Sequence, residues 1–398
     1  METKLSSVRQ GTLRSLNLAV VLHEVLTSST PVSRAHIAQS TGMTRSTVGR
    51  LVDELVAAGL VAELEVVTDG RRGRPATPLV APQGTVAALG LEVNVGLICA
   101  RVIDLSGQVL AQRIVTGDYR QSEPAAVLRE LALLARSCLD EAGTSVQIVG
   151  AALAVPGLVD GDSGVILRAP NLGWQDVETA GAFAATQLLP PAMAVRVANE
   201  ADCSAVVVAH EAPGRPSTLR DFLYISGEIG IGSALVWGGE VRLGRHGWAG
   251  EIGHMCIDPN GPRCGCGARG CLEVYAGQLA MCDACSVNGL PALQSLLDQG
   301  DVRAREVIAE AGRALGIALA NALNLLDVST VVLGGHLGQL QEQLCLHAMA
   351  ELDERLLSSP FGRPDLMPTE LDAASAATGA AFGVLARVIE DPCASILS

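Results

Sequence analysis

Apolar residues recur at helical spacing near the start of the chain. Over residues 12–26 this spacing predicts a helix whose buried face is made of Leu13, Leu16, Leu18, Val20, Val21, Val25 and Leu26. Pro31 breaks the pattern, Ser33 can cap a second helix that starts at residue 34, and Gly42 suits the turn after it. Thr44 can cap a third helix with a buried stripe of Val48, Leu51, Val52, Leu55 and Val56. The pattern therefore predicts three consecutive helices in an N-terminal unit.

The pattern changes after Gly59. Residues 60–67 alternate weakly like a strand, and the segment TDGRRGRPAT at 68–77 predicts a glycine-rich turn. This order is typical of a winged helix-turn-helix, here over residues 1–80, in which the third helix meets base edges and the wing grips the DNA backbone or minor groove. The candidate DNA-binding residues are Thr44, Arg45, Ser46, Thr47, Arg50, Arg71, Arg72 and Arg74. The alternative is a protein-interaction domain whose arginines are ordinary solvated charges.

Beyond Val86, short apolar strands alternate with helices. Strand patterns cover 86–93, 95–104, 148–160, 222–227 and 330–335, and helical patterns cover 124–143 and 307–327. Two strand-rich blocks, near 86–170 and 220–335, predict an α/β body of two similar lobes around a cleft. We place the first lobe at 85–198 plus about 372–398 and the second lobe, with the cysteine-rich segment, at 199–371.

Composition and charge support this division. The 398 residues, 49% of them hydrophobic, are too many for one core. The net charge of −14 argues against nucleic-acid binding, but residues 1–80 hold nine Lys and Arg against seven Asp and Glu. No apolar stretch reaches the roughly 18 uncharged residues of a membrane helix. With no signal peptide recognisable, we expect a cytoplasmic protein with reduced cysteines.

A cluster of metal-binding residue types lies between residues 246 and 273, which read HGWAGEIGHMCIDPNGPRCGCGARGCLE. His254, Cys264, Cys266 and Cys271 match a Cys3His zinc site, and four protein ligands leave no position for a catalytic water. The sequence thus predicts a structural zinc ion. The alternative is a reduced, cysteine-rich turn without metal. For the nearby Cys282 and Cys285 we favour packing over a second metal.

The order of motifs resembles the ROK family (repressor, open reading frame, kinase), and in particular its transcriptional regulators of the xylose and N-acetylglucosamine repressor type. The matching segments are GRRGRP at 70–75, PNLGW at 170–174, NEA at 199–201, SGEIGIG at 226–232, HGWAGEIGH at 246–254, CLE at 271–273 and VVLGGHL at 331–337. The resemblance implies a winged helix-turn-helix fused to an actin-like, sugar-kinase-like body of ribonuclease H-like fold. It also implies a sugar site made of Asn199, Glu200, Glu251, His254 and Glu273, with Asn171 as a further contact and Trp174 as an apolar wall.

The chain departs from the family's kinases in three segments. Where those kinases have D-x-G-G-T, this chain has Glu92 to Gly96 with side chains in place of both adjacent glycines, so backbone amides cannot approach phosphate closely. The catalytic Asp of the family's Asn-Asp pair is Glu200, one methylene longer. Glu228 places a carboxylate in the second phosphate loop. The only lysine is Lys4. We therefore expect no enzyme activity, with weak residual kinase activity as the alternative.

These expectations combine into one hypothesis. The chain would be a sugar-responsive regulator, most readily a repressor of carbohydrate uptake or catabolism genes, that binds an inverted-repeat operator as a homodimer or homotetramer. Its effector would be a sugar or sugar phosphate held by a non-catalytic body. One alternative is an ATP-dependent sugar kinase with an accessory DNA-binding head. A second is a body that docks a protein of sugar transport.

Overall fold

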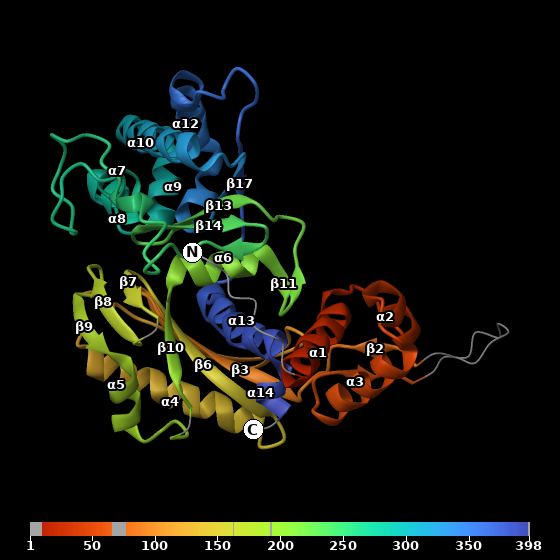
Figure 1. The fold of residues 1–398 in the computed structure, drawn as a ribbon. Helices are drawn as coiled ribbons and strands as arrows, with labels where there is room; N and C mark the ends of the chain where they lie inside the picture. The colour runs from red at the N-terminus through yellow and green to blue at the C-terminus, as the bar shows by residue number, and fades with distance from the viewer. Residues whose placement is uncertain (1–9, 66–76, 162, 192, 397–398) are drawn as a thin grey trace, which may run out of the picture.

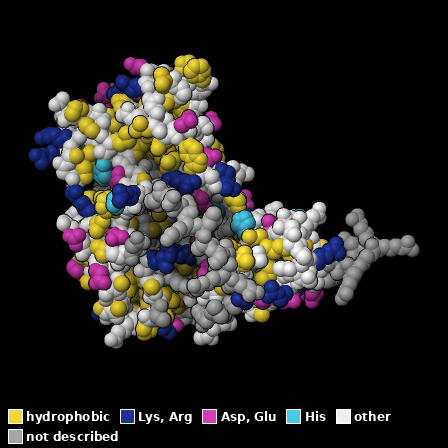
Figure 2. Space-filling view, viewed as in Figure 1, with side chains coloured by type: hydrophobic (Ala, Val, Ile, Leu, Met, Phe, Trp, Pro, Cys, Tyr) yellow, Lys and Arg dark blue, Asp and Glu magenta, His cyan; other side chains and the backbone are white. Residues whose placement is uncertain are grey.

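The structure of the protein is a computed structural model that describes residues 10–65, 77–161, 163–191 and 193–396. A small helical head formed by the N-terminal residues lies beside a larger body built around two five-stranded sheets (Figure 1). Charged side chains of both signs are interspersed over the face of the body shown in Figure 2. Within the described residues, no helix is long and apolar enough to cross a membrane.

The head contains the three predicted helices, α1 (Gln10–Thr27), α2 (Arg34–Thr41) and α3 (Arg45–Ala57). Ser33 caps α2 by accepting a hydrogen bond from the His36 amide, and Thr44 caps α3 by accepting one from the Thr47 amide. Gly42 adopts a φ of 72° between the two helices, a conformation that other residues rarely adopt. These caps and this turn confirm the predicted helix starts.

Two short antiparallel strands follow, β1 (Ala62–Glu63) and β2 (Leu79–Val80). Of the strand predicted over residues 60–67, the described part is extended only at β1. Residues 66–76, which hold Arg71, Arg72 and Arg74 of the predicted wing, lie outside the described residues. The wing therefore stays a prediction.

The first helix buries a narrower face than the sequence predicted. Most of the predicted residues are buried, and Leu22 joins them with none of its surface exposed. Leu13, Leu16 and Val20 lie on the other side of α1 and are 49%, 53% and 42% exposed. The prediction was wrong for these three residues because α1 is apolar on two sides, and spacing alone does not tell which side meets the rest of the protein.

The first sheet of the body has the strand order β10-β6-β3-β4-β5. Its strands are β3 (Val86–Val93), β4 (Leu97–Asp104), β5 (Val109–Thr116), β6 (Gln147–Val155) and β10 (Val195–Asn199). β3, β4 and β5 form an antiparallel meander, whereas β6 runs parallel to β3 and to β10. The helices α4 (Pro124–Ala142) and α13 (Ser375–Glu390) cover its two faces (Figure 1). A small sheet and a helix extend it: β7 (Leu158–Asp160), β8 (Val165–Ala169), β9 (Trp174–Glu178) and α5 (Thr179–Thr186).

The second sheet has the order β15-β14-β13-β16-β17. Its strands are β13 (Phe222–Gly227), β14 (Ile231–Trp237), β15 (Glu240–Val241), β16 (Thr330–Leu333) and β17 (Asp365–Pro368). The helices α10 (Val302–Leu326) and α12 (Gln341–Arg355) pack on each other, while α6 (Glu200–Ala209) packs on both β14 and α13. The remaining elements are β11 (His210–Ala212), β12 (Arg215–Pro216), the 3-10 helix η1 (Ile252–His254), α7 (Glu273–Ala276), α8 (Gln278–Ala284), α9 (Leu290–Asp298), α11 (Gly335–Gln339) and α14 (Pro392–Ile396). The two sheets with their covering helices confirm the predicted α/β body.

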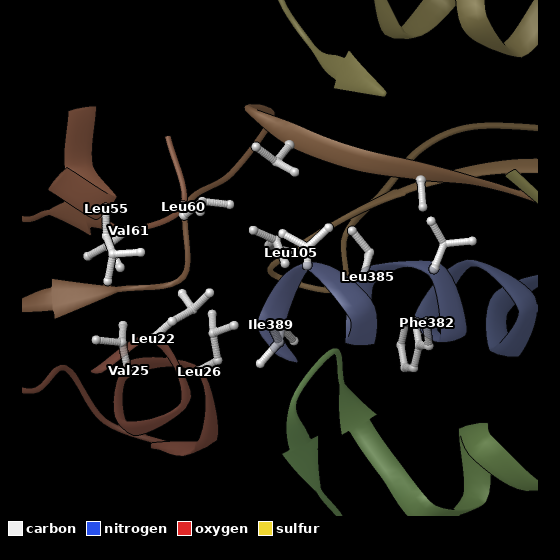
Figure 3. Close-up of a cluster of buried hydrophobic side chains, with 14 of the residues drawn as sticks. Leu22, Val25, Leu26, Leu55, Leu60, Val61, Leu105, Phe382, Leu385 and Ile389 are labelled. Carbon is white, nitrogen blue, oxygen red and sulfur yellow. The ribbon is translucent and has the colours of Figure 1, made fainter. Parts of the chain in front are cut away.

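One hydrophobic core joins the head to the body (Figure 3). Leu22 and Leu26 of α1 lie in the same buried cluster as Leu105, Leu385 and Ile389 of the body. A Cβ at Gly214 would lie 3.4 Å from Leu26 Cβ and 2.9 Å from Ile389 Cδ1, so these side chains meet closely. The head is thus packed on α13 and does not hang from a linker.

Candidate functional site

Four side chains from the segment between β15 and α7 converge on one point. His254, Cys264, Cys266 and Cys271 each offer one ligand atom, and these atoms lie within 4.8 Å of one another. Sγ of Cys266 lies 3.7 Å from Sγ of Cys271, and Nδ1 of His254 lies 3.8 Å from Sγ of Cys264. A tetrahedral ion with bonds of about 2.0–2.3 Å separates its donors by about 3.3–3.8 Å. The four residues therefore fit a closed metal site.

The backbone around the cluster folds tightly. Gly270 adopts a φ of 64°, and a Cβ there would lie 1.6 Å from the carbonyl oxygen of Asp258. Only glycine allows this approach, which places Cys271 opposite Cys256 in an isolated β-bridge. Burial and the neighbouring thiols raise the pKa of Cys271 to about 12. A bound cation would favour the thiolate that metal binding requires.

The other cysteines near the cluster do not belong to it. Cys256 is exposed and lies outside the group of converging ligand atoms. Cys282 is buried, and Cys285 packs partly buried against the same hydrophobic cluster. The expectation that Cys282 and Cys285 serve packing is therefore confirmed.

A pocket lies beside the cluster, at the facing ends of the two sheets. It is lined by all five residues of the predicted sugar set, with Asn171 as a sixth. Asn199 ends β10, Glu200 begins α6, and Glu251 precedes η1, whose last residue is His254. Glu273 is the first residue of α7. The fold thus brings together residues of the predicted set that lie as far apart in the sequence as Asn171 and Glu273.

The adjacent Asn199 and Glu200 have different roles in the structure. Asn199 Oδ1 caps α6 by accepting from the Ala201 amide at 2.8 Å, and Asn199 Nδ2 donates to the Gly157 carbonyl at 2.9 Å. Glu200 is 8% exposed, and its Oε1 accepts from the Ser204 and Ser226 hydroxyls at 3.3 Å each. Burial and the nearby Glu228 raise the pKa of Glu200 to about 7. Near neutral pH, Glu200 can therefore both accept and donate hydrogen bonds.

His254 lies between the metal cluster and the pocket. Its Nδ1 faces Cys264 of the cluster, and its Nε2 lies 3.9 Å from Glu251 Oε2. Glu273 connects the same two regions: its Oε1 accepts from Cys264 Sγ at 3.8 Å, and its Oε2 accepts from the Ile231 amide at 3.3 Å. A metal ion in the cluster would therefore fix one wall of the pocket through His254.

In the segment that matches the kinase phosphate loop, side-chain oxygens of the protein accept hydrogen bonds from its own backbone amides. Glu92 is 2% exposed, and its Oε2 accepts from the Ala377 amide in the first turn of α13 at 3.0 Å. Burial and the charge of Glu200 raise the pKa of Glu92 to about 8. Asn94 Oδ1 accepts from the Val95 amide at 2.7 Å. The backbone amides of Ala377 and Val95 are thus both hydrogen-bonded to side chains of this segment.

Two parts of the pocket were not as the sequence suggested. Trp174 was expected to form an apolar wall, but it does not line the pocket: it is 2% exposed within the first lobe's core, and its Nε1 donates to the Ser122 carbonyl at 3.0 Å. Ser226 and Asn94 line the pocket and were not predicted. Ser226 begins the matched SGEIGIG motif, and Asn94 lies in the segment that corresponds to the kinase phosphate loop, so these two motifs were the available signal.

The candidate DNA-binding residues described in the structure surround the start of α3. Arg45, Ser46 and Arg50 are exposed, as is Thr44, whose hydroxyl lies 2.8 Å from that of the half-buried Thr47. Arg50 forms an ion pair of 3.2 Å with Glu54, which also pairs with Arg14 of α1 at 2.8 Å. The first turn of α3 is thus a free surface with donors and a positive charge, as major-groove contact requires.

Fold and site together define a two-lobed sugar-kinase-like body with a DNA-binding type of head. The ROK family profile matches residues 88–387, and the chain belongs to the ROK family. A MarR family profile matches residues 19–72 of the head.

Individual proteins extend this likeness over nearly the whole chain. The xylose repressor of Bacillus subtilis (strain 168) is 26% identical over 378 residues, which cover 93% of this chain and 95% of that protein. The DNA-binding transcriptional dual regulator NagC of Escherichia coli (strain K12) is 27% identical, covering 95% and 94%. A ROK family transcriptional regulator, a homolog of the E. coli MLC protein, shares the fold with a TM-score of 0.78 and 24% identity over 97% of this chain and 99% of that chain. The ROK hexokinase of Thermus thermophilus has a TM-score of 0.59 and 28% identity, covering 74% and 97%.

Proposed function

We propose that the protein is a sugar-responsive, DNA-binding transcriptional regulator that represses carbohydrate genes in the cytoplasm. The observation that carries the proposal is the shared core that packs the helix-turn-helix head against α13. The first turn of α13 donates a hydrogen bond to Glu92, a buried acid that interacts electrostatically with Glu200 of the pocket. The relatives that cover nearly the whole chain are named as regulators, which supports the same function. Sugar in the pocket would change the position of the head through this contact.

In this proposal Asn199, Glu200, Glu251, His254 and Glu273 bind sugar hydroxyls. Carboxylates accept hydrogen bonds from vicinal hydroxyls, and the amide and imidazole offer donors. We keep the division into a head at 1–80, a first lobe at 85–198 plus about 372–398, and a second lobe at 199–371. The packing of α13 on β3 and β6 supports joining the C-terminal segment to the first lobe.

The body would bind sugar without phosphorylating it. Glu92 and Asn94 already hold the backbone amides of Ala377 and Val95, and Glu228 adds a carboxylate to the pocket lining. ATP phosphates would meet like charges there. A coupled ADP-release assay with a panel of hexoses and pentoses tests this proposal. Turnover with any sugar would favour the kinase alternative, which the fold of the Thermus hexokinase also fits.

The metal of the Cys3His cluster would be a structural zinc ion held by His254, Cys264, Cys266 and Cys271. A zinc ion there would orient His254 through Nδ1 and leave Nε2 directed to the pocket. Metal analysis of the purified protein should show about one zinc per chain. Cys271→Ser should lose this zinc, whereas the matched control Cys285→Ser should keep it. Zinc retained by Cys271→Ser would contradict the proposed ligand set.

The DNA-bound form would be a homodimer or homotetramer on an inverted repeat. Leu325, Leu357 and Phe361 support association, because they are 84%, 85% and 92% exposed and Leu357 is tied to the end of α10 by a 3.0 Å hydrogen bond to Asn324. Such exposed apolar side chains are often covered by a second subunit.

The decisive experiment measures DNA affinity with and without sugar. An operator selected from genomic fragments would be titrated by fluorescence anisotropy in the presence of single free sugars. One sugar should change the affinity. Arg45→Ala or Arg50→Ala should reduce discrimination between operator and random DNA, whereas Arg71→Ala or Arg74→Ala should weaken binding to both and reduce its salt dependence. Unchanged binding in all four variants would contradict the DNA-binding role of the head.

A further inference from the structure

A second cavity lies where the head meets both lobes of the body. Its volume is about 540 Å³, and small-molecule sites usually have volumes of about 300–1,000 Å³. Its walls are made by parts of α6, α13, β10 and β15, and His23 of α1 lines it from the head. Within the described residues it shares no lining residue with the sugar pocket around Glu200 and His254. It is therefore a separate cavity.

Helix α6 contributes different residues to the two cavities. Glu200 and Ala201 line the sugar pocket, whereas Asp202, Val206 and His210 line the second cavity. The last three residues follow one another at a spacing of four positions, which places them along one side of the helix. The side of α6 that carries Asp202 is thus free of any part in sugar binding.

The buried part of the second cavity's lining is mainly apolar. Phe382, Val384 and Ile389 belong to α13 and Val197 belongs to β10, and each is at most 7% exposed. An apolar ligand surface gains free energy by leaving water for such surroundings. The lining arginines and glutamates are exposed and can stay hydrated, so the apolar side chains and any buried polar group determine what binds. These exposed residues are Arg196, Arg387, Glu240 and Glu390.

Asp202 is the charged residue that is buried in this lining. It is 7% exposed, and its backbone amide donates to Asn199 Oδ1 at 3.3 Å. Its carboxylate, in contrast, has no hydrogen bond and no ion pair within the residues that the structure describes. Burial and the charge of Glu251 raise the pKa of Asp202 to about 7. Buried carboxyl groups are normally paired, so the missing partner indicates that a ligand in the cavity supplies the hydrogen-bond donor.

We propose that this cavity binds a small apolar amine, with the ammonium group paired to Asp202 and the apolar part packed against α13. An ammonium group supplies both a hydrogen-bond donor and the opposite charge. An alcohol supplies the donor alone, and a carboxylate or phosphate would meet the negative charge of Asp202. The ligand would contact the head through His23 as well as both lobes. The inference adds a second binding site to the protein and does not depend on the sugar pocket.

The test is isothermal titration calorimetry of the full-length protein with three probes that carry the same phenyl ring. At neutral pH phenethylamine is cationic, phenethyl alcohol is uncharged and phenylacetate is anionic. The amine should bind saturably and at least about tenfold more tightly than the alcohol, because an ion pair adds to the hydrogen bond. Phenylacetate should bind most weakly. No saturable binding of phenethylamine, or binding no tighter than that of the alcohol or of phenylacetate, would overturn the proposal.

Substitutions then locate the bound amine. Asp202→Asn keeps the shape of the side chain and should weaken phenethylamine binding by about tenfold, with the affinity for phenethyl alcohol kept within about threefold. Asp298→Asn, at an exposed position of α9, and Glu228→Gln, in the sugar pocket, should change neither affinity.

A second substitution tests the cavity itself. Gly383 belongs to the lining, and no atom lies within 4 Å of the position of its Cβ, so Gly383→Leu should fold and fill the space. Neither the amine nor the alcohol should then bind, and urea unfolding checks that each variant is folded. Phenethylamine binding that is unchanged in Asp202→Asn or in Gly383→Leu, or lost in Glu228→Gln, would place the amine elsewhere and contradict the proposal.

Discussion

The core shared by head and body predicts that a mutation in the head destabilises the body. Leu22 of α1 has no exposed surface and lies in the cluster that contains Ile389 of α13. Replacing a fully buried leucine by alanine costs about 2–5 kcal/mol, because transfer free energy is lost and a cavity remains. With a urea dependence of about 3 kcal/mol per molar, a loss of about 3 kcal/mol lowers the unfolding midpoint by about 1 M.

Tryptophan fluorescence is the appropriate assay because the three tryptophans, Trp174, Trp237 and Trp248, all lie in the body. Leu22→Ala should therefore shift a transition that is detected only in the body. Leu16→Ala is the matched control: it makes the same chemical change in the same helix at a position 53% exposed, and it should cost less than about 0.5 kcal/mol. If Leu22→Ala abolishes DNA binding but leaves the tryptophan transition in place, the head folds independently and the reasoning is refuted.

Three further predictions concern other parts of the molecule. Burial raises the pKa of Glu92 to about 8. The protonated carboxyl therefore contributes its full stability to the fold below about pH 4.5, and this contribution is lost as pH rises through 8. Urea titrations from about pH 5 to about pH 8 should show a falling free energy of unfolding, and the fall should be smaller in Glu92→Gln. Gly379→Ala should destabilise the protein, because its Cβ would lie 1.8 Å from the Cys203 carbonyl oxygen. Gly383→Ala in the same helix meets no atom within 4 Å, and it should raise the free energy of unfolding, measured by thermal denaturation, by about 1 kcal/mol. Ser33→Ala removes the α2 cap and should cost about 1 kcal/mol by the same measurement; no loss would show that the cap is replaceable.

The helices and strands that were predicted could be recognised because their signals are local. Ser33, Gly42 and Thr44 act on neighbouring backbone groups, and the apolar runs of β3 and β13 are buried along their whole length as their composition suggests. The side of α1 that is buried could not be predicted, since it depends on α13, more than three hundred residues away in the sequence.

The candidate site, too, was predictable from spacing only where its residues lie close together in the sequence. The metal cluster was predictable because its four ligands lie within eighteen residues. The sugar set was found through resemblance to a family, and no spacing rule joins Asn199 to Glu273. The hydrogen bond from Ala377 to Glu92 spans 285 positions and had no signal in the sequence. Trp174 was misplaced because a tryptophan near a polar motif can equally belong to a core.

The packing of α1 on α13 also bears on how the protein is made. The head leaves the ribosome before the body, yet the buried surface of Leu22 and Leu26 needs Leu385 and Ile389, which follow more than 350 residues later in the chain. N-terminal domains generally fold while the rest of the chain is still being translated, but this one lacks part of its core until α13 has been synthesised. A nascent or truncated chain without α13 would therefore not present a finished head to DNA. The order of synthesis would thus delay DNA binding by the head until the body that contains the sugar pocket has been made.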